Sequence, residues 1–116
     1  LPSALAGELA AAAAGGAEIA ALLDGGRPVA FCYAGSLTET LWDVSIDTLP
    51  AERRRGYAGQ CAAWLIRRWA ARGKAPVWQA VTDNPPSWRL ALKLGFAPCA
   101  ELVYFQAPEA ERSPAA

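Results

Sequence analysis

The segment from Thr40 to Arg72 changes its hydrophobic period once, and this change constrains the fold more than any other feature of the chain. Over Thr40–Thr48 apolar and polar residues alternate, which predicts a strand with one buried face. The apolar residues are Trp42, Val44 and Ile46, and the polar ones are Asp43, Ser45 and Asp47. Beyond Pro50 the apolar spacing becomes that of an amphipathic helix from about Gly56 to Arg72. A strand that leads through a short loop into such a helix predicts an α/β domain.

The remaining segments are assigned by the same criteria. We expect helices over residues 1–14 and 87–94, and strands over residues 18–23, 27–34, 75–81 and 99–106. The turn Asp24-Gly25-Gly26 joins the first two strands in a hairpin. This order predicts a layered α/β fold in which an antiparallel meander precedes strand–helix–strand crossovers. The 116 residues suffice for one domain, which we place at residues 1–107, with residues 108–116 as a flexible tail.

Composition excludes several classes of function. Lys and Arg together number 11, as do Asp and Glu, so no basic excess points to nucleic acid. No apolar run approaches the roughly 20 residues of a membrane span. Histidine is absent, which removes Ser-His and Cys-His catalysis, and no metal site is predicted. The three scattered cysteines are expected to be buried in a reducing compartment, which predicts a cytoplasmic location.

Three arginines stand where the central helix is expected to begin, in the stretch ERRRGYAGQ of residues 52–60. A helix N-terminus carries about half a positive charge, so acidic residues would be the stabilising choice there. Arginines at this point make sense if an anion binds, because the first helical amides lack internal partners. Gly56 lets the backbone approach such a ligand closely.

Two motifs in this chain resemble the GNAT superfamily of N-acetyltransferases. The first is Arg53-x-x-Gly56-x-Ala58 after a strand and Pro50, which is similar to the acyl-CoA loop of that family. The second runs from Asn84 to Phe96, where an asparagine precedes a short amphipathic helix that ends in Leu-Gly-Phe. The resemblance covers roughly residues 27–105, and the spacing between the motifs leaves room for one helix and one strand.

The resemblance implies a mixed, splayed central sheet flanked by helices, without the first strand and helix of the family, and acetyl-CoA as co-substrate. Backbone groups of Thr48, Leu49 and Pro50 would pair with the pantetheine arm. Amides of the loop would hold the pyrophosphate, and its arginines would add charge; these residues are Arg53, Arg54, Arg55, Gly56, Tyr57 and Ala58. Asn84 would bond the cofactor arm, with Ser87 close by.

The catalytic residues follow less directly from the resemblance. Many members carry a tyrosine acid four residues before the glycine of Leu-Gly-Phe, but this chain has Ala91 there. Tyr104 on the expected last strand is the substitute proton donor. Asp43 is the candidate general base, with Glu39 and Asp47 as further candidates.

The resemblance implies transfer of an acetyl group to a primary amine of a small molecule or peptide. The alternative is a non-catalytic acyl-CoA-binding or partner-binding module, which Ala91 and the absent N-terminal elements favour. Exposed tryptophans and an open sheet edge favour a homodimer.

Overall fold

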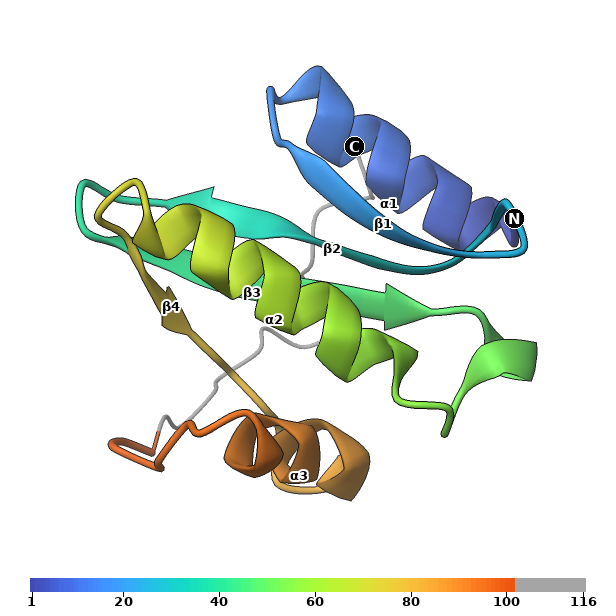
Figure 1. Ribbon diagram of the computed structural model, residues 1–116. Coiled ribbons are helices and arrows are strands. Elements are labelled where there is room, and N and C mark those ends of the chain that lie inside the picture. Colours follow the sequence, from blue (N-terminus) through green and yellow to red (C-terminus); the bar gives the residue numbers. More distant parts are fainter. Residues whose placement is uncertain (102–116) are drawn as a thin grey trace, which may run out of the picture.

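The computed structural model describes residues 1–101, which form one four-stranded sheet flanked by helices (Figure 1). The elements are α1 (Ser3–Ala14), β1 (Ile19–Asp24), β2 (Arg27–Leu37), β3 (Leu41–Thr48), η1 (Pro50–Glu52), α2 (Tyr57–Ala70), β4 (Ala75–Val77) and α3 (Pro85–Lys93). The strands lie side by side in the order β1-β2-β3-β4, with β1 to β3 antiparallel and β4 parallel to β3. This architecture confirms the predicted mixed α/β fold with flanking helices.

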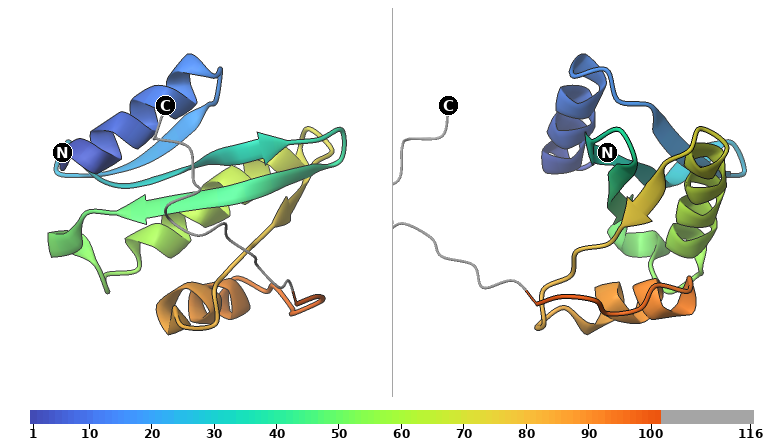
Figure 2. Two further views of the ribbon diagram at one scale, coloured as in Figure 1. Left: turned by 180° about the vertical axis from the view of Figure 1, so that it is seen from behind. Right: turned by 90° about the vertical axis from the view of Figure 1, so that its left-hand side faces the viewer.

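Helices cover both faces of the central strand β2, with α1 on one side and α2 on the other (Figure 2). Phe31 and Tyr33 of β2 pack with Leu9 of α1. Ala30 and Cys32 alternate with them and belong to the cluster under α2. Both sets are buried because successive residues of a strand point to opposite faces of the sheet.

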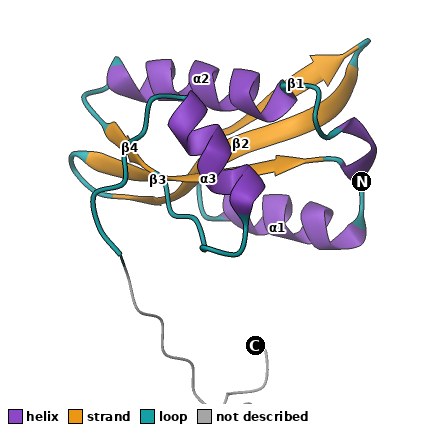
Figure 3. Cartoon of the chain, turned by 90° about the horizontal axis from the view of Figure 1, so that it is seen from below, coloured by secondary structure: helices purple, strands orange, loops and turns teal. Residues whose placement is uncertain are grey.

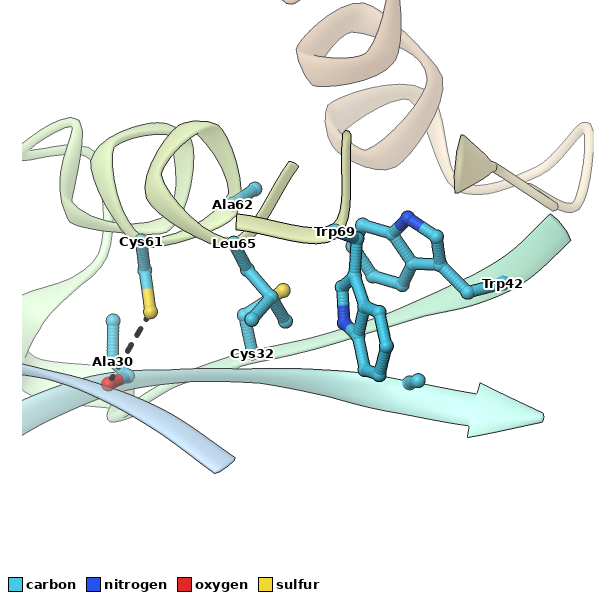
Figure 4. Packing of buried hydrophobic residues seen from close by; sticks show 8 residues of the cluster. Ala30, Cys32, Trp42, Cys61, Ala62, Leu65 and Trp69 are labelled. Carbon is cyan, nitrogen blue, oxygen red and sulfur yellow. Dashed lines mark hydrogen bonds between the residues drawn. The ribbon is translucent and has the colours of Figure 1, made fainter. Parts of the chain in front are cut away.

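The main hydrophobic core lies between α2 and the sheet (Figure 4). Leu65 of α2 and Trp42 of β3 are each only 1% exposed. The rings of Trp42 and Trp69 lie 6.3 Å apart between centroids, and the Cys61 thiol donates to the Ala20 carbonyl at 3.5 Å. The alternation predicted for β3 is confirmed, since its apolar side chains pack in this core and Asp43, Ser45 and Asp47 do not.

The pairing of β3 with β4 is short. It runs from Leu41 opposite Ala75 to Asp43 opposite Val77, and then the strands part. Residues 44–48 therefore have β2 along one edge and, within the described part of the chain, no strand along the other. Figure 1 shows α3 below β3, on this side of the sheet, and Figure 3, the view from below, shows α3 crossing in front of the strands. The ring of Trp78, which follows β4, lies 5.4 Å from that of Phe96 and ties the α3 segment to the core.

Several sequence expectations are corrected by the structure. The strand expected over residues 75–81 ends at Val77, because its pairing with β3 ends there. Residues 99–101 have no regular structure, and the rest of the strand expected to Gln106 lies outside the described residues, as does the tail 108–116. Cys32 and Cys61 are buried as expected, but Cys99 is exposed. Among the described residues, no helix is long and apolar enough to cross a bilayer.

Truncating the core under α2 tests this packing. Leu65→Ala should lower the free energy of unfolding by about 2–5 kcal/mol, because it removes buried methyl groups and leaves a cavity. Leu92→Ala is the matched control, since Leu92 is 48% exposed and its truncation should change stability by less than about 0.5 kcal/mol. Urea unfolding followed by circular dichroism measures both. Equal effects of the two substitutions would contradict the assigned core.

Candidate functional site

The loop between β3 and α2 has an unusual backbone. Arg54 has a φ of 66° and Gly56 has a φ of 78°, both in the left-handed region. Glycine adopts this region freely, but a residue with a side chain is strained there by about 1–3 kcal/mol. Strain of this kind persists only where surrounding contacts impose it, and it concentrates at functional sites.

The amides of this loop face no protein acceptor. The Glu52 N–H donates to the Leu49 carbonyl at 2.8 Å, and the next backbone donor along the chain is Gln60, whose N–H bonds the Gly56 carbonyl at 3.1 Å. Within the described residues, the amides of residues 53–59 have no hydrogen-bond acceptor, and no side chain caps α2. Unpaired amides at the positive end of a helix dipole form a site for an anion.

The three arginines differ in their surroundings. Arg55 Nη1 lies 3.2 Å from Glu52 Oε2, and Arg27 donates a hydrogen bond to the other oxygen of the same carboxylate. Arg53 and Arg54 are exposed and make no ion pair within the described residues. Glu52, only 5% exposed, was not singled out from the sequence. Its signal is an acid three residues before an arginine, a spacing that brings side chains together.

Thr48, Leu49 and Pro50 lie at the end of the open edge of β3. Thr48 pairs with Ala30 of β2. The Leu49 N–H donates to the Val29 carbonyl at 3.0 Å, and the Leu49 carbonyl accepts from Glu52. Pro50 has no N–H group. The backbone groups free to pair with an added chain are therefore those along the open edge of residues 44–48. The Leu49 carbonyl can also accept a second hydrogen bond.

Asn84 and Ser87 lie at the start of α3. Asn84 is exposed at the N-cap position, but its side chain does not cap the helix. The Ser87 hydroxyl accepts a hydrogen bond from the Trp78 indole at 3.2 Å. A Cβ placed at Gly59 would lie 3.4 Å from the Leu90 side chain, so α3 lies within van der Waals distance of the first turns of α2.

Acidic groups collect on the other face of β3, beneath α1. The Tyr33 hydroxyl donates to Glu8 at 2.7 Å, and the Glu8 and Asp47 carboxyls each affect the pKa of the other. Sequence reasoning missed Glu8 and Tyr33. Glu8 could have been found as the one charged residue of the alanine-rich segment 1–14.

The two carboxyls of this pair have pKa values that are moved in opposite directions. Desolvation, the hydrogen bond with Glu8 and its negative charge raise the pKa of Asp47 to about 7, against an opposing effect of Arg53. Hydrogen bonds from Asp47 and Tyr33 lower the pKa of Glu8. When the pKa values of two neighbouring carboxyls differ in this way, one can stay charged while the other carries a proton.

The residues predicted to be catalytic fall in different places. Asp43 lies on the same strand as Asp47, its pKa is raised by desolvation, and its Oδ1 is buried without a hydrogen-bond partner among residues 1–101. A Cβ at Gly35 would lie 2.7 Å from Ser45 Oγ and 3.3 Å from Asp43 Oδ2, so a glycine at this position leaves room for both side chains. Glu39 lies in the turn before β3, at the opposite end of the strand from Thr48. Tyr104 lies outside the described residues.

A groove of about 790 Å³ runs between β1 and α2 and does not include the loop of residues 53–58. Its wall includes Glu18, which pairs with Arg68 and Arg72, and contains none of the loop amides of residues 53–59 that lack an acceptor in the described part of the chain. We therefore place the candidate site at the loop and the open edge of β3.

Comparison with protein families identifies the class to which this site belongs. The model of the GNAT acetyltransferase family matches residues 16–105, which include β1 to α3, the loop and the open edge. The chain belongs to the GNAT acetyltransferase family. A comparison with curated proteins finds no significant match.

Solved structures share the fold. A GCN5-related N-acetyltransferase-like protein from Streptococcus suis is 33% identical over 65% of this chain and 29% of its own, with a TM-score of 0.59. An aminoglycoside N-acetyltransferase in complex with CoA is 20% identical over 76% of this chain and 73% of its own, with a TM-score of 0.63. A ribosomal-protein-alanine N-acetyltransferase from Brucella melitensis is 17% identical over 84% and 64% of the two chains, with a TM-score of 0.69. The chain thus spans between about a third and three quarters of these structures.

The acidic pair predicts a pH dependence of stability. Asp47 has a pKa of about 7 in the folded protein, against an ordinary value of 3.8. Between these two pH values Asp47 therefore holds a proton in the folded state that it does not hold in the unfolded state. The free energy of unfolding should therefore fall as pH rises from about 4 to about 7. Asp47→Asn should flatten this fall and be more stable than the wild type at pH 8.

Urea unfolding at pH 5, 6, 7 and 8 measures this difference. Asp83→Asn, which alters an exposed aspartate, is the control and should follow the wild-type curve. If Asp47→Asn also ran parallel to the wild type, Asp47 would not carry the extra proton.

Proposed function

We propose that this chain transfers an acetyl group from acetyl-CoA to a primary amine of a small molecule or peptide. The observation that carries the proposal is the row of amides at residues 53–59, which have no acceptor in the part of the chain that the structure describes and which follow the open edge of β3. A diphosphate fits the first feature, and an extended amide-containing arm fits the second. CoA contains both, joined in one molecule.

The cofactor would lie along β3 with its diphosphate at the N-terminus of α2. Amides of residues 53–59 would donate to the phosphate oxygens, and Arg53 and Arg54 would add positive charge. The pantetheine amides would bond the free backbone groups of residues 44–48 and the carbonyl of Leu49, as an added strand bonds a sheet edge. Asn84, whose side chain has no bond in the described structure, would contact the arm from the α3 side.

The chemistry would be direct attack of the amine on the thioester carbonyl. Holding both reactants in place lowers the barrier by about 7–11 kcal/mol in favourable cases. The attacking ammonium must lose a proton first, and a base that titrates near neutral pH suits this step. Asp47, with a pKa of about 7, and Asp43 on the same strand are the proposed bases. Tyr104 remains the proposed donor of a proton to the leaving thiolate.

The aminoglycoside N-acetyltransferase has also been solved with a bisubstrate analogue in which CoA is linked to an acetylneamine. The acidic groups of Glu8, Asp43 and Asp47 would favour a cationic amine acceptor in the present chain by charge attraction.

A non-catalytic acyl-CoA-binding module is the second candidate. The observation that favours it is Ala91, which stands at the position of the tyrosine acid and is 7% exposed, so its place offers no proton donor. Binding of acetyl-CoA without turnover across a panel of primary amines would favour this candidate over the transferase.

Placing a carboxylate in the loop tests the assigned cofactor site. Gly56→Glu should abolish CoA binding measured by titration calorimetry, because it strains a residue at φ 78° and adds negative charge beside the diphosphate. Gly73→Glu is the matched control, since Gly73 has a φ of 79° at the opposite end of α2. It should lose similar stability and keep its affinity. Undiminished binding by the Gly56 variant would refute the site.

The proposed base predicts a pH profile. The kcat/KM for acetyl transfer should rise with pH to a plateau above about 7, because Asp47 must be deprotonated to accept the proton. Asp47→Asn should lower the plateau at least about tenfold and remove the inflection. Stopped reactions with a thiol reagent measure the released CoA. Should Asp43→Asn remove the inflection instead, the base would be Asp43.

A further inference from the structure

The strained residue of the loop is held between two oppositely charged side chains. Arg54, at φ 66°, lies between Glu52 and Arg55, which form an ion pair at 3.2 Å. This pair spans Arg53 and Arg54 and closes the backbone around them. Residues held in the left-handed region need such outside contacts, since a relaxed chain avoids it.

The carboxylate of this pair is itself anchored to the sheet. Glu52 is 5% exposed, and its other oxygen accepts a hydrogen bond from Arg27, the first residue of β2. Tyr57, the first residue of α2, donates to Asp24, the last residue of β1, at 3.1 Å. The loop is therefore attached at both ends to the β1–β2 hairpin, and Glu52 is the buried member of these contacts.

We propose that Glu52 is a positioning residue for the diphosphate site: the ion pair of its buried carboxylate with the exposed Arg55 side chain holds Arg54 in the left-handed conformation, which leaves the amides of residues 53–59 without acceptors in the described part of the chain. Glu52 would touch no ligand itself. This inference rests on the proposed binding of CoA and adds a residue that the cofactor motif does not contain.

Charge alone predicts the opposite effect, which makes the inference testable. Glu52 places a negative charge beside the phosphates, so its neutralisation would strengthen anion binding if only electrostatics mattered. If Glu52 positions the loop, its neutralisation releases the strained conformation and weakens binding. The sign of the change in affinity therefore separates the two explanations.

The first experiment measures CoA affinity by titration calorimetry for the wild-type chain and for Glu52→Gln. We expect about tenfold weaker binding by the variant, the loss expected when the loop must be reordered on binding. Glu18→Gln is the matched control, because Glu18 also pairs with two arginines but lies away from the loop. It should bind CoA as the wild type does.

A rescue experiment adds a readout that general loss of structure would not produce. Both Arg54→Gly and Arg54→Ala, made in the Glu52→Gln background, lose the charge of Arg54. The glycine variant should nevertheless bind CoA more tightly than the alanine variant, because glycine adopts a positive φ without the ion pair and alanine does not. Charge alone predicts equal effects for these two substitutions.

Three outcomes decide the proposal. Glu52→Gln with equal or tighter CoA binding would overturn it, as would equal affinities of the two double variants. If Glu52→Gln does not fold, Arg27→Ala replaces it, since Arg27 has a side chain 61% exposed and its loss weakens the same anchor. It should bind CoA about threefold more weakly, and unchanged affinity would count against the proposal. Failure of the wild type to bind CoA would instead refute the proposed function.

Discussion

The packing of α2 on β2 and β3 determines where the positive end of this helix points. Leu65, Cys61 and Trp69 bury one stripe of α2 against the sheet, and Trp42 of β3 completes the core. Because this contact fixes the helix axis, the first amides of α2 come to lie just beyond Thr48, where β3 ends. The anion site and the open strand edge are thus adjacent as a consequence of one hydrophobic interface. If that interface moved, neither feature alone would match a ligand with both a diphosphate and an extended arm.

Charges of opposite sign lie around the same strand. Arginines 53 to 55 follow the end of β3, and Glu8, Asp43 and Asp47 lie on its α1 face. Arg53 acts on Asp47 by lowering its pKa, although burial and Glu8 outweigh it. A cofactor that neutralised Arg53 would therefore weaken this opposing effect and raise the pKa of Asp47 further. Such coupling would make proton uptake by Asp47 easier once the cofactor is bound.

Much of the fold was predictable because its signals are local. The alternation over β3, the helical spacing of α2 and the turn at Asp24 each report side-chain burial within a few residues, and the structure confirms them. The predicted length of β4 was wrong because its end depends on where β3 parts from it, which no local pattern records.

The arginine loop could be recognised from the sequence because arginines are unfavourable at a helix N-terminus. Glu8 and Tyr33 were missed, since they meet Asp47 only through packing of α1 on the sheet. Glu52 was missed because its hydrogen-bond partner Arg27 lies 25 residues earlier in the chain.

The central claim is that the unpaired amides at the start of α2 bind a diphosphate, and NMR tests it most directly. A ¹⁵N-labelled chain titrated with CoA should show its largest amide shifts at residues 53–59, with smaller shifts along residues 44–48. Dephosphorylated pantetheine, which lacks the diphosphate, should move the second group and leave the first unchanged. Amide shifts confined to other parts of the chain, or loop amides that respond equally to both compounds, would contradict the account.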